Sequence, residues 1–302
     1  MGVETARDVG PSGIDVAFER FGAPDAPPLL LIMGLATQML GWPDGFCEML
    51  ANCGVHVIRF DNRDVGLSIH LHDAPKANVM AAVQGDTSSA SYVLADMAAD
   101  AVGLLDALEL DSAHIVGASM GGMIAQIVAI DHPERVRSLT SIMSTTGDTS
   151  VGRPTPAALG TLLSPPASSR DEAMDRAVKV FRIIGSPGFE LDVDELRDRA
   201  GRAFDRANDP QGVARQMLAV IASPDRTAAL RTVSAPTLVL HGADDSLVNV
   251  SGARATAEAI PGAEVVIIDG MGHDLPRALW PHITERIAEL VARAESVVRA
   301  RD

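Results

Sequence analysis

Hydrophobic and polar positions along the chain follow two recurring patterns. Short, mostly apolar runs are followed by longer stretches whose apolar positions recur at helical spacing. Continuous apolar runs are typical of strands buried on both faces, and their alternation with helices predicts a parallel sheet. Strands are expected at residues 29–33, 55–60, 113–116, 138–143, 237–241 and 264–268. Residues 14–18 instead alternate between apolar and polar, which predicts an exposed antiparallel strand.

Helices are expected between these strands. Their apolar positions fall on one face, so that each helix can pack that face onto the sheet. The stretch from Tyr92 to Leu108 shows this spacing most clearly. The other expected helices span residues 43–52, 122–129 and 279–298.

The alternation of strand and helix breaks at about residue 145. Residues 145–232 contain loops rich in Pro, Ser and Gly and three amphipathic stretches, near 171–184, 193–207 and 211–222. We therefore predict an α/β core at 1–144 and 233–302, interrupted by a helical cap, or lid, at 145–232. Residues 1–12 are expected to be frayed, and residues 70–90 to form a loop because they lack clean periodicity.

Net charge, apolar runs and cysteine content limit which partners and which cellular compartment are expected for this protein. Forty acidic and 25 basic residues give a formal net charge of −15, which argues against binding to nucleic acid or to anionic membranes. No start typical of a signal peptide and no apolar run of about 20 residues is present, which predicts a cytoplasmic protein without an integral membrane segment. Cys47 and Cys53 lack other metal ligands nearby and are interpreted as small buried apolar residues.

Candidate chemistry is concentrated first at residues 117–121, which read Gly-Ala-Ser-Met-Gly. Gly-x-Ser-x-Gly between a strand and a helix is a nucleophile elbow. The glycines allow a sharp turn that holds Ser119 in a strained conformation, at a helix N-terminus whose dipole favours negative charge. The motif alone also fits an ordinary glycine-rich turn, so its meaning depends on the partners that follow it.

A carboxylate and a base follow in the order that this motif requires. Asp245 comes directly after the strand at 237–241, and Asp244 is its rival; an Asp that only caps the next helix is the alternative. His273 lies on a glycine-rich turn after the last strand. A serine hydroxyl is a weak nucleophile, so His273 would take its proton, and Asp245 would orient the imidazole and stabilise its charged form.

The tetrahedral intermediate also needs two hydrogen-bond donors for its oxyanion. One is expected to be the backbone N–H of Met120, the residue after the nucleophile. The other should come from the loop after the strand at 29–33, where we nominate the N–H of Leu35.

A charged, turn-rich stretch at residues 61–68 reads Asp-Asn-Arg-Asp-Val-Gly-Leu-Ser. It could bind substrate. The alternative, which we favour, is a structural network in which Arg63 pairs with carboxylates and loop carbonyls, a task that suits the guanidinium fork.

Five motifs together resemble the α/β-hydrolase superfamily. They are Leu-Leu-Leu-Ile-Met-Gly at 29–34, Asp-Asn-Arg-Asp-x-Gly-x-Ser at 61–68, Gly-Ala-Ser-Met-Gly-Gly at 117–122, Gly-x-x-Asp-x-x-Val at 242–248 and Gly-Met-Gly-His at 270–273. In detail the chain is similar to bacterial carboxylesterases of the aclacinomycin methylesterase group and to mycobacterial lipase/esterase-like hydrolases.

This resemblance implies a mostly parallel eight-stranded sheet flanked by helices, with a helical cap inserted after the sixth strand. It implies Ser119 as nucleophile, Asp245 as acid and His273 as base, with no metal and no organic cofactor. Met33 stands where His is commoner, which removes a side-chain donor near the oxyanion loop and leaves the backbone donors in place.

Three functions stay open, in decreasing order of preference. The first is hydrolysis of a carboxylic ester, of a small and possibly apolar or lipid-like molecule, through an acyl-enzyme. The second is hydrolysis of a carbon–carbon bond, or cofactor-free haloperoxidase or perhydrolase chemistry, on the same fold. The third is a non-catalytic ligand receptor, because fold alone does not decide function. We expect a monomer or a homodimer.

Overall fold

In the computed structural model, which describes residues 2–299, eight strands form one sheet in the order β1-β2-β4-β3-β5-β6-β7-β8. β1 pairs antiparallel with β2 and β2 with β4, and every other neighbouring pair is parallel. The predicted fold class is thus confirmed. The strands are β1 (Glu4–Val9), β2 (Ile14–Phe21), β3 (Pro28–Ile32), β4 (His56–Phe60), β5 (Ala113–Ala118), β6 (Val136–Ile142), β7 (Thr237–Gly242) and β8 (Glu264–Ile268).

The central strands are buried on both faces, as their continuous apolar runs predict. Every residue of β3 and of β5 is buried. Alternate residues of β3 belong to two separate apolar clusters, with Leu30 and Ile32 in one and Leu29 and Leu31 in the other. Two helical layers cover the sheet and keep its backbone groups away from water, so that the sheet is a rigid platform for the loops at its ends.

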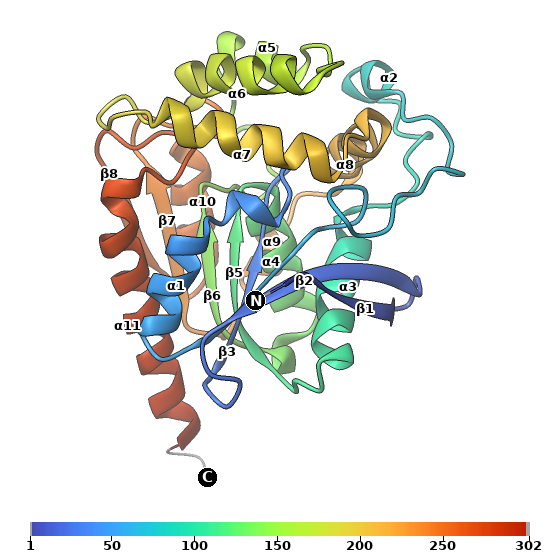
Figure 1. Cartoon of the computed structure of the whole chain (residues 1–302). Coiled ribbons are helices and arrows are strands. Elements are labelled where there is room, and N and C mark those ends of the chain that lie inside the picture. Colours follow the sequence, from blue (N-terminus) through green and yellow to red (C-terminus); the bar gives the residue numbers. More distant parts are fainter. Residues whose placement is uncertain (1, 300–302) are drawn as a thin grey trace.

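The two layers contain different helices. α3 and α4 contribute to one apolar cluster, and α1 and α11 contribute to the other (Figure 1). The helices of the core and of the loop after β4 are α1 (Asp44–Asn52), α2 (Val79–Val83), α3 (Leu94–Ala107), α4 (Met120–Asp131), α10 (Ser251–Ala259) and α11 (Trp280–Arg299), with short 3-10 turns η1 (Met39–Gly41), η2 (Pro133–Arg135) and η3 (Arg277–Leu279).

The regular structure between β6 and β7 is helical, and residues 156–222 lie above the carboxyl ends of the parallel strands (Figure 1), whereas residues 227–230 pack against α4 and α10 of the core. We call residues 145–232 the inserted segment. It begins after the sixth strand in sequence, as expected, and its amphipathic helices follow the predicted ranges closely. They are α5 (Pro156–Leu162), α6 (Arg170–Ile184), α7 (Val193–Arg206), α8 (Pro210–Ala222) and α9 (Thr227–Leu230).

Three sequence expectations about the N-terminal half are wrong. Residues 14–18 were expected to form an exposed strand, but four of the five are buried in β2, because that strand lies between β1 and β4. Residues 1–12 were expected to fray, but Glu4–Val9 form an edge strand whose last residue, Val9, is buried. The hairpin packs closely on α3, because a Cβ on Gly103 would overlap the backbone of Gly10. Residues 70–90 were expected to be loop throughout, but contain the short helix α2, which Asn78 caps. Met1 and residues 300–302, which the prediction assigned to the core, lie outside the described residues.

The two cysteines also differ from each other. Cys47 is buried in α1, as expected, but Cys53 is exposed. α1 ends at Asn52, so Cys53 is the residue that follows its last turn rather than a member of its buried face. The expectation that both thiols are buried is therefore wrong for Cys53.

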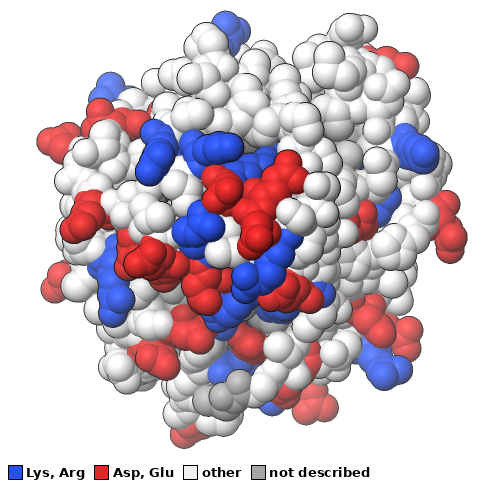
Figure 2. Space-filling view, turned by 45° about the horizontal axis from the view of Figure 1, so that its top comes forward, with Lys and Arg blue, Asp and Glu red and all other residues white. Residues whose placement is uncertain are grey.

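The surface above the sheet carries both signs of charge. Figure 2, in which this face comes forward, shows Lys and Arg side chains interspersed with Asp and Glu. Several of these charges pair on α6 and α7, as in Arg202 with Asp198 at 2.9 Å and Arg170 with Asp205 at 2.9 Å. Within residues 2–299, no helix combines the length and the apolar character needed to cross a membrane.

Candidate active site

Ser119 occupies a strained turn between β5 and α4. Its φ is 56° and its ψ is −120°, a conformation that a residue with a side chain rarely adopts. The turn is possible because its neighbours are small. A Cβ on Gly117 would overlap the carbonyl of Gly121, and a Cβ on Gly121 would overlap the carbonyl oxygen of Ile32. The sequence therefore requires glycine on both sides of the serine, and the hydroxyl stands at the N-terminus of α4.

His273 and Asp245 come to Ser119 from the two loops that follow β8 and β7. The Nε2 atom of His273 lies 2.9 Å from the Ser119 hydroxyl, and its Nδ1 atom lies 2.7 Å from a carboxylate oxygen of Asp245. His273 and Asp245 are both buried. The structure thus brings the three predicted residues into one chain of hydrogen bonds, because the carboxyl ends of parallel strands meet at one edge of the sheet.

The Asp245 carboxylate faces three hydrogen-bond partners, and a second imidazole lies close to it. One of its oxygens accepts from the backbone N–H groups of Leu247 and Val248, each at 2.8 Å. The other faces His273, and the Nε2 atom of His241 lies 3.4 Å away. Burial acts to raise the pKa of Asp245, but the two imidazoles outweigh it and hold that pKa well below its usual range.

Asp244, the rival carboxylate, is exposed and faces away from the imidazole. It accepts a hydrogen bond of 2.9 Å from the backbone N–H of Gly270. Its contact therefore fixes the turn that carries His273, while Asp245 alone of the two reaches the ring itself.

The loop after β3 lies against the serine. A Cβ on Gly34 would come within 3.1 Å of the Ser119 Cβ, so that glycine allows the close approach. Within residues 2–299, the backbone N–H groups of Leu35 and Met120 have no hydrogen-bond acceptor in the protein. The side chain of Asn62 supports this loop by donating to the carbonyl of Met33 at 2.9 Å.

Residues of the inserted segment complete the site, and sequence reasoning missed them. The carbonyl of Ile184 accepts from the backbone N–H of His273 at 2.7 Å. The buried Gln216 accepts from the N–H of Ala36 at 3.0 Å and donates to the carbonyl of Arg63 at 2.7 Å. These contacts depend on how the inserted segment docks, and no spacing along the chain signals them.

The charged stretch at 61–68 forms a buried structural network. Both carboxylate oxygens of Asp100 accept from the guanidinium of Arg63, each at 2.6 Å. Asp61 accepts from the backbone N–H of Met39 at 2.7 Å and pairs with Arg206 at 2.6 Å. Because these side chains are satisfied by protein partners, the structural interpretation of this stretch is favoured over substrate binding.

A surface pocket of about 290 Å³ lies on the far side of the His273 turn. Its walls include Phe181 and Phe189 from the inserted segment and the carboxylates of Asp244 and Asp274 from the core. Burial raises the pKa of Asp274, and its hydrogen bond with Ser186 opposes that rise. This pocket borders the turn that carries His273 without containing Ser119.

Comparison with known proteins agrees with this geometry. The sequence profile of the alpha/beta hydrolase fold matches residues 27–185. Rhodomycin D methylesterase DnrP of Streptomyces peucetius is 33% identical over 280 residues, which are 86% of this chain and 89% of that protein. A 2-hydroxy-6-oxononadienedioate/2-hydroxy-6-oxononatrienedioate hydrolase of Paraburkholderia phymatum is 26% identical over 267 residues, or 87% of this chain and 85% of its own.

The fold is also that of solved hydrolases. The 2-hydroxy-6-oxo-6-phenylhexa-2,4-dienoate hydrolase of Rhodococcus sp. strain RHA1 superimposes with a TM-score of 0.73 at 20% identity, covering 96% of this chain and all of that one. The sequence profile, the sequence relatives and the solved structure are all hydrolases. The chain belongs to the α/β hydrolase fold family.

Proposed function

We propose that this protein is a serine hydrolase that cleaves a carboxylic ester through an acyl-enzyme. One observation carries the proposal: the continuous chain of hydrogen bonds from the Ser119 hydroxyl through His273 to Asp245, at 2.9 and 2.7 Å. The 33% identity to a methylesterase over most of the chain supports an ester as substrate. The broader assignment, an ester hydrolase of this family, is supported by that sequence relationship as well as by the site.

Each residue has a defined task in this reaction. The Ser119 oxygen attacks the ester carbonyl while its proton moves to Nε2 of His273. Collapse of the tetrahedral intermediate breaks the carbonyl–oxygen bond, and His273 returns the proton to the departing alcohol. Water then attacks the acyl group, again with His273 as base, and releases the acid and the free serine. Asp245 keeps the Nδ1 proton in place and stabilises the imidazolium during both steps.

The oxyanion would bind between two backbone N–H groups. Leu35 and Met120 are the donors that we propose, because both groups are without a protein partner in the described chain and their loops flank Ser119. Loss of one such donor typically costs about 3 kcal/mol of transition-state stabilisation. Since Asn62 and Gln216 hold the backbone on either side of Leu35, they would set the position of its N–H.

We propose the inserted segment, 145–232, as a lid over a core made of 1–144 and 233–302. Its residues 156–222 lie above the strand ends that carry the three residues (Figure 1). The substrate would therefore be a small molecule that enters beneath α6 and α7. The relative named as a methylesterase favours a methyl ester of a larger molecule as the first class to test.

The proposal is tested with a series of p-nitrophenyl esters of rising acyl length and with a fluorophosphonate probe. The wild-type protein should release p-nitrophenol and become labelled at one serine. The variant Ser119→Ala should lose both properties and keep its melting temperature. Ser296→Ala is the matched control, because this exposed hydroxyl on α11 only donates to the carbonyl of Arg293. Labelling of Ser119→Ala, or activity near that of the wild type, would refute the assignment.

Hydrolysis of a carbon–carbon bond is the second candidate. It is favoured by the 26% identical relative, which is named as a hydrolase of 2-hydroxy-6-oxononadienedioate and 2-hydroxy-6-oxononatrienedioate. The same three residues would serve, with the proton delivered to carbon instead of oxygen. Turnover of a ring-opened dienone acid without turnover of any ester would favour this candidate. A folded protein that neither turns over substrate nor reacts with the fluorophosphonate would instead favour a ligand receptor.

A further inference from the structure

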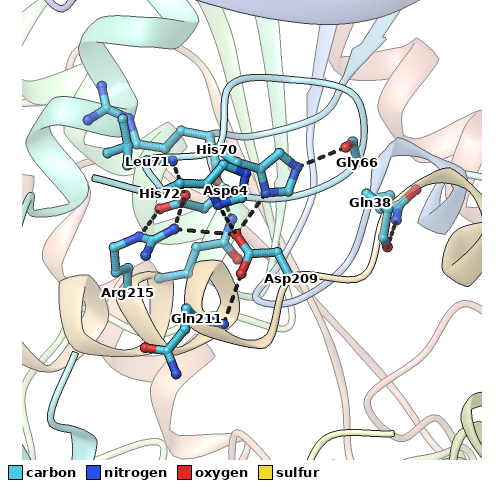
Figure 3. A network of polar contacts seen from close by, with 12 residues as sticks. Gln38, Asp64, Gly66, His70, Leu71, His72, Asp209, Gln211 and Arg215 are labelled. Atoms are coloured by element: carbon cyan, nitrogen blue, oxygen red, sulfur yellow. Dashed lines mark hydrogen bonds and ion pairs between the residues drawn. The ribbon is translucent and has the colours of Figure 1, made fainter. Parts of the chain in front are cut away.

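Three side chains with metal-binding atoms meet away from the serine, where the loop after β4 approaches the start of α8. They are His70 and His72 from that loop and Asp209, the residue that caps α8. One ligand atom from each lies within 4.8 Å of the other two. Figure 3 shows the two imidazoles and the carboxylate directed toward one another.

Both ring nitrogens of His70 face hydrogen-bond acceptors. Its Nε2 atom lies 3.0 Å from the carbonyl oxygen of Gly66, and its Nδ1 atom lies 2.9 Å from a carboxylate oxygen of Asp209 (Figure 3). Both neighbours are acceptors only, whereas a neutral imidazole has a single N–H to donate. When Nε2–H donates to the carbonyl of Gly66, the Nδ1 atom and the carboxylate bring two lone pairs to within 2.9 Å of each other, and either a second ring proton or a metal ion would stabilise this contact.

Two buried histidines show the contrast with the half-buried His70. His114 places one ring nitrogen 2.8 Å from the Ser138 hydroxyl and the other 3.1 Å from the Glu295 carboxylate. His273 likewise faces a hydroxyl and a carboxylate. Each of these rings has one partner that can donate and one that can accept, so a neutral imidazole satisfies it.

The spacing suits a divalent transition metal. Zinc–nitrogen and zinc–oxygen bonds of about 2.0–2.2 Å place two ligand atoms on one ion about 2.9–3.6 Å apart. The distance from Nδ1 of His70 to Asp209 falls in this range, and Nδ1 of His72 lies 3.9 Å from the same oxygen. The His72 side chain is 74% exposed, so a small rotation of its ring closes the remaining gap.

The surroundings of these residues resemble those of metal-binding side chains. A ligating histidine usually donates its other N–H to a carbonyl, as His70 does to Gly66. The second oxygen of Asp209 is engaged by the N–H of Gln211 at 3.0 Å, which fixes the carboxylate. The rings of His70 and His72 stack at 5.5 Å, and a hydrogen bond of 2.9 Å from the N–H of His72 to the carbonyl of His70 holds the turn that aligns them.

The local charge also permits a cation. Arg215 is the nearest positive group, 3.4 Å from Asp209, but it makes two hydrogen bonds to Asp64 at 2.9 and 2.7 Å. Two carboxylates thus face one guanidinium, so the site has a negative charge to spare before any metal arrives. Two imidazoles and one carboxylate favour zinc, copper, nickel or cobalt over magnesium or calcium, which prefer oxygen ligands.

We propose that His70, His72 and Asp209 bind one divalent transition metal, with water at the open positions. The ion would join the loop after β4 to the first turn of α8, and so fasten the inserted segment to the core. Its role is structural, because these side chains make no hydrogen bond to Ser119, His273 or Asp245 in the described residues. The resemblance to the α/β-hydrolase superfamily implies no metal, and no motif signals this cluster, because His70 and Asp209 lie 139 positions apart.

The test uses the full chain without an affinity tag, after dialysis against a chelator. Zinc chloride is titrated calorimetrically, and cobalt chloride is followed by visible absorption, which reports its coordination geometry. One equivalent of zinc should bind and raise the melting temperature. His72→Ala, and Asp209→Asn, which keeps the helix cap, should weaken binding at least about tenfold and abolish the shift. His282→Ala, another exposed histidine, is the matched control and should bind like the wild type.

The outcomes separate a metal from a proton between the two groups. Wild-type protein without saturable zinc binding would overturn the proposal and leave an ordinary imidazolium–carboxylate pair. Equal affinities in the wild type, His72→Ala and Asp209→Asn would overturn it as well, because the ion would then bind elsewhere. In the absence of metal, His72→Ala should hydrolyse esters at the same rate as the wild type. The metal-site proposal can therefore fail without affecting the proposal of ester hydrolysis, and the reverse also holds.

Discussion

Replacing Asp245 by asparagine tests the proton arrangement of the proposed triad most sharply. The amide oxygen can still accept from the N–H groups of Leu247 and Val248, now at 2.8 Å each. The amide nitrogen then stands in place of the oxygen that is 2.7 Å from Nδ1 of His273. Because that nitrogen donates, Nδ1 must accept, and the ring proton moves to Nε2.

The consequence falls on catalysis and not on folding. With a proton on Nε2, the ring of His273 can no longer accept the Ser119 proton across the 2.9 Å that separates them. A wrong tautomer of this kind lowers kcat about 10⁴-fold, or about 5.4 kcal/mol of activation free energy, in enzymes with this constellation. The surrounding hydrogen bonds persist, so the melting temperature should change little.

The assay is the initial rate of p-nitrophenyl butyrate hydrolysis at several substrate concentrations, with calorimetric melting in parallel. Asp244→Asn is the matched control, because this neighbouring carboxylate is exposed and bonds only the N–H of Gly270. It should keep kcat close to the wild-type value. Asp245→Asn within tenfold of the wild type, or an equal loss in Asp244→Asn, would refute the assigned roles.

Three further outcomes follow from packing and burial. Gly121→Ala should destabilise the fold by at least about 2 kcal/mol in urea unfolding, because its Cβ would overlap the Ile32 carbonyl; a stability equal to the wild type would contradict the turn geometry. Burial lowers the pKa of His114 from 6.5 to about 4, so the unfolded chain binds the proton more readily. The free energy of unfolding should therefore fall by up to about 3 kcal/mol as the pH drops from about 6.5 to 4, and His114→Gln should flatten that slope; an unchanged slope would show that other groups cause it. Burial also raises the pKa of Cys47 to about 12, so in the native protein a disulfide reagent should modify one thiol quickly, that of Cys53, and two fast thiols would contradict this.

The sequence predicts those strands that are buried on both faces, because burial leaves a continuous apolar run along the chain. β3, β5 and β7 are buried on both faces, and a run of apolar residues reveals them directly. β1 was missed because only two of its six residues are buried, so its pattern looks polar. Its order comes from pairing with β2 and from close packing on α3, and such non-local contacts leave no periodic signal along the chain.

The same distinction holds for the site. Residues 119, 245 and 273 could be nominated from sequence because each follows a strand, and strand ends of a parallel sheet share one edge. The N–H groups of Leu35 and Met120 were nominated by the same reasoning, and the structure leaves both without a protein acceptor among residues 2–299. Gln216 was out of reach, because its role arises only when α8 docks beside the loop after β3.

That docking limits how the inserted segment can move. At the α7–α8 end, the buried carboxylates of Asp61 and Asp64 pair with Arg206 and Arg215 at 2.6 and 2.7 Å. Leaving one charge of a buried ion pair without its partner typically costs about 3–5 kcal/mol, and swinging this end away from the core would break two such pairs at once. The same movement would withdraw Gln216 from Ala36 and loosen the proposed oxyanion loop.

The opposite end is held by hydrogen bonds, including one from the Ser186 hydroxyl to the Asp274 carboxylate, and among residues 2–299 no ion pair joins it to the core. There the Ser246 hydroxyl donates to the carbonyl of Ile183 at 3.0 Å, and the N–H of His273 donates to that of Ile184 at 2.7 Å. A neutral hydrogen bond contributes about 1 kcal/mol net, less than the cost of leaving a buried charge without its partner. If the inserted segment opens for substrate, we expect opening to begin at the C-terminal end of α6, while the α8 end stays closed and keeps the proposed oxyanion donors in position.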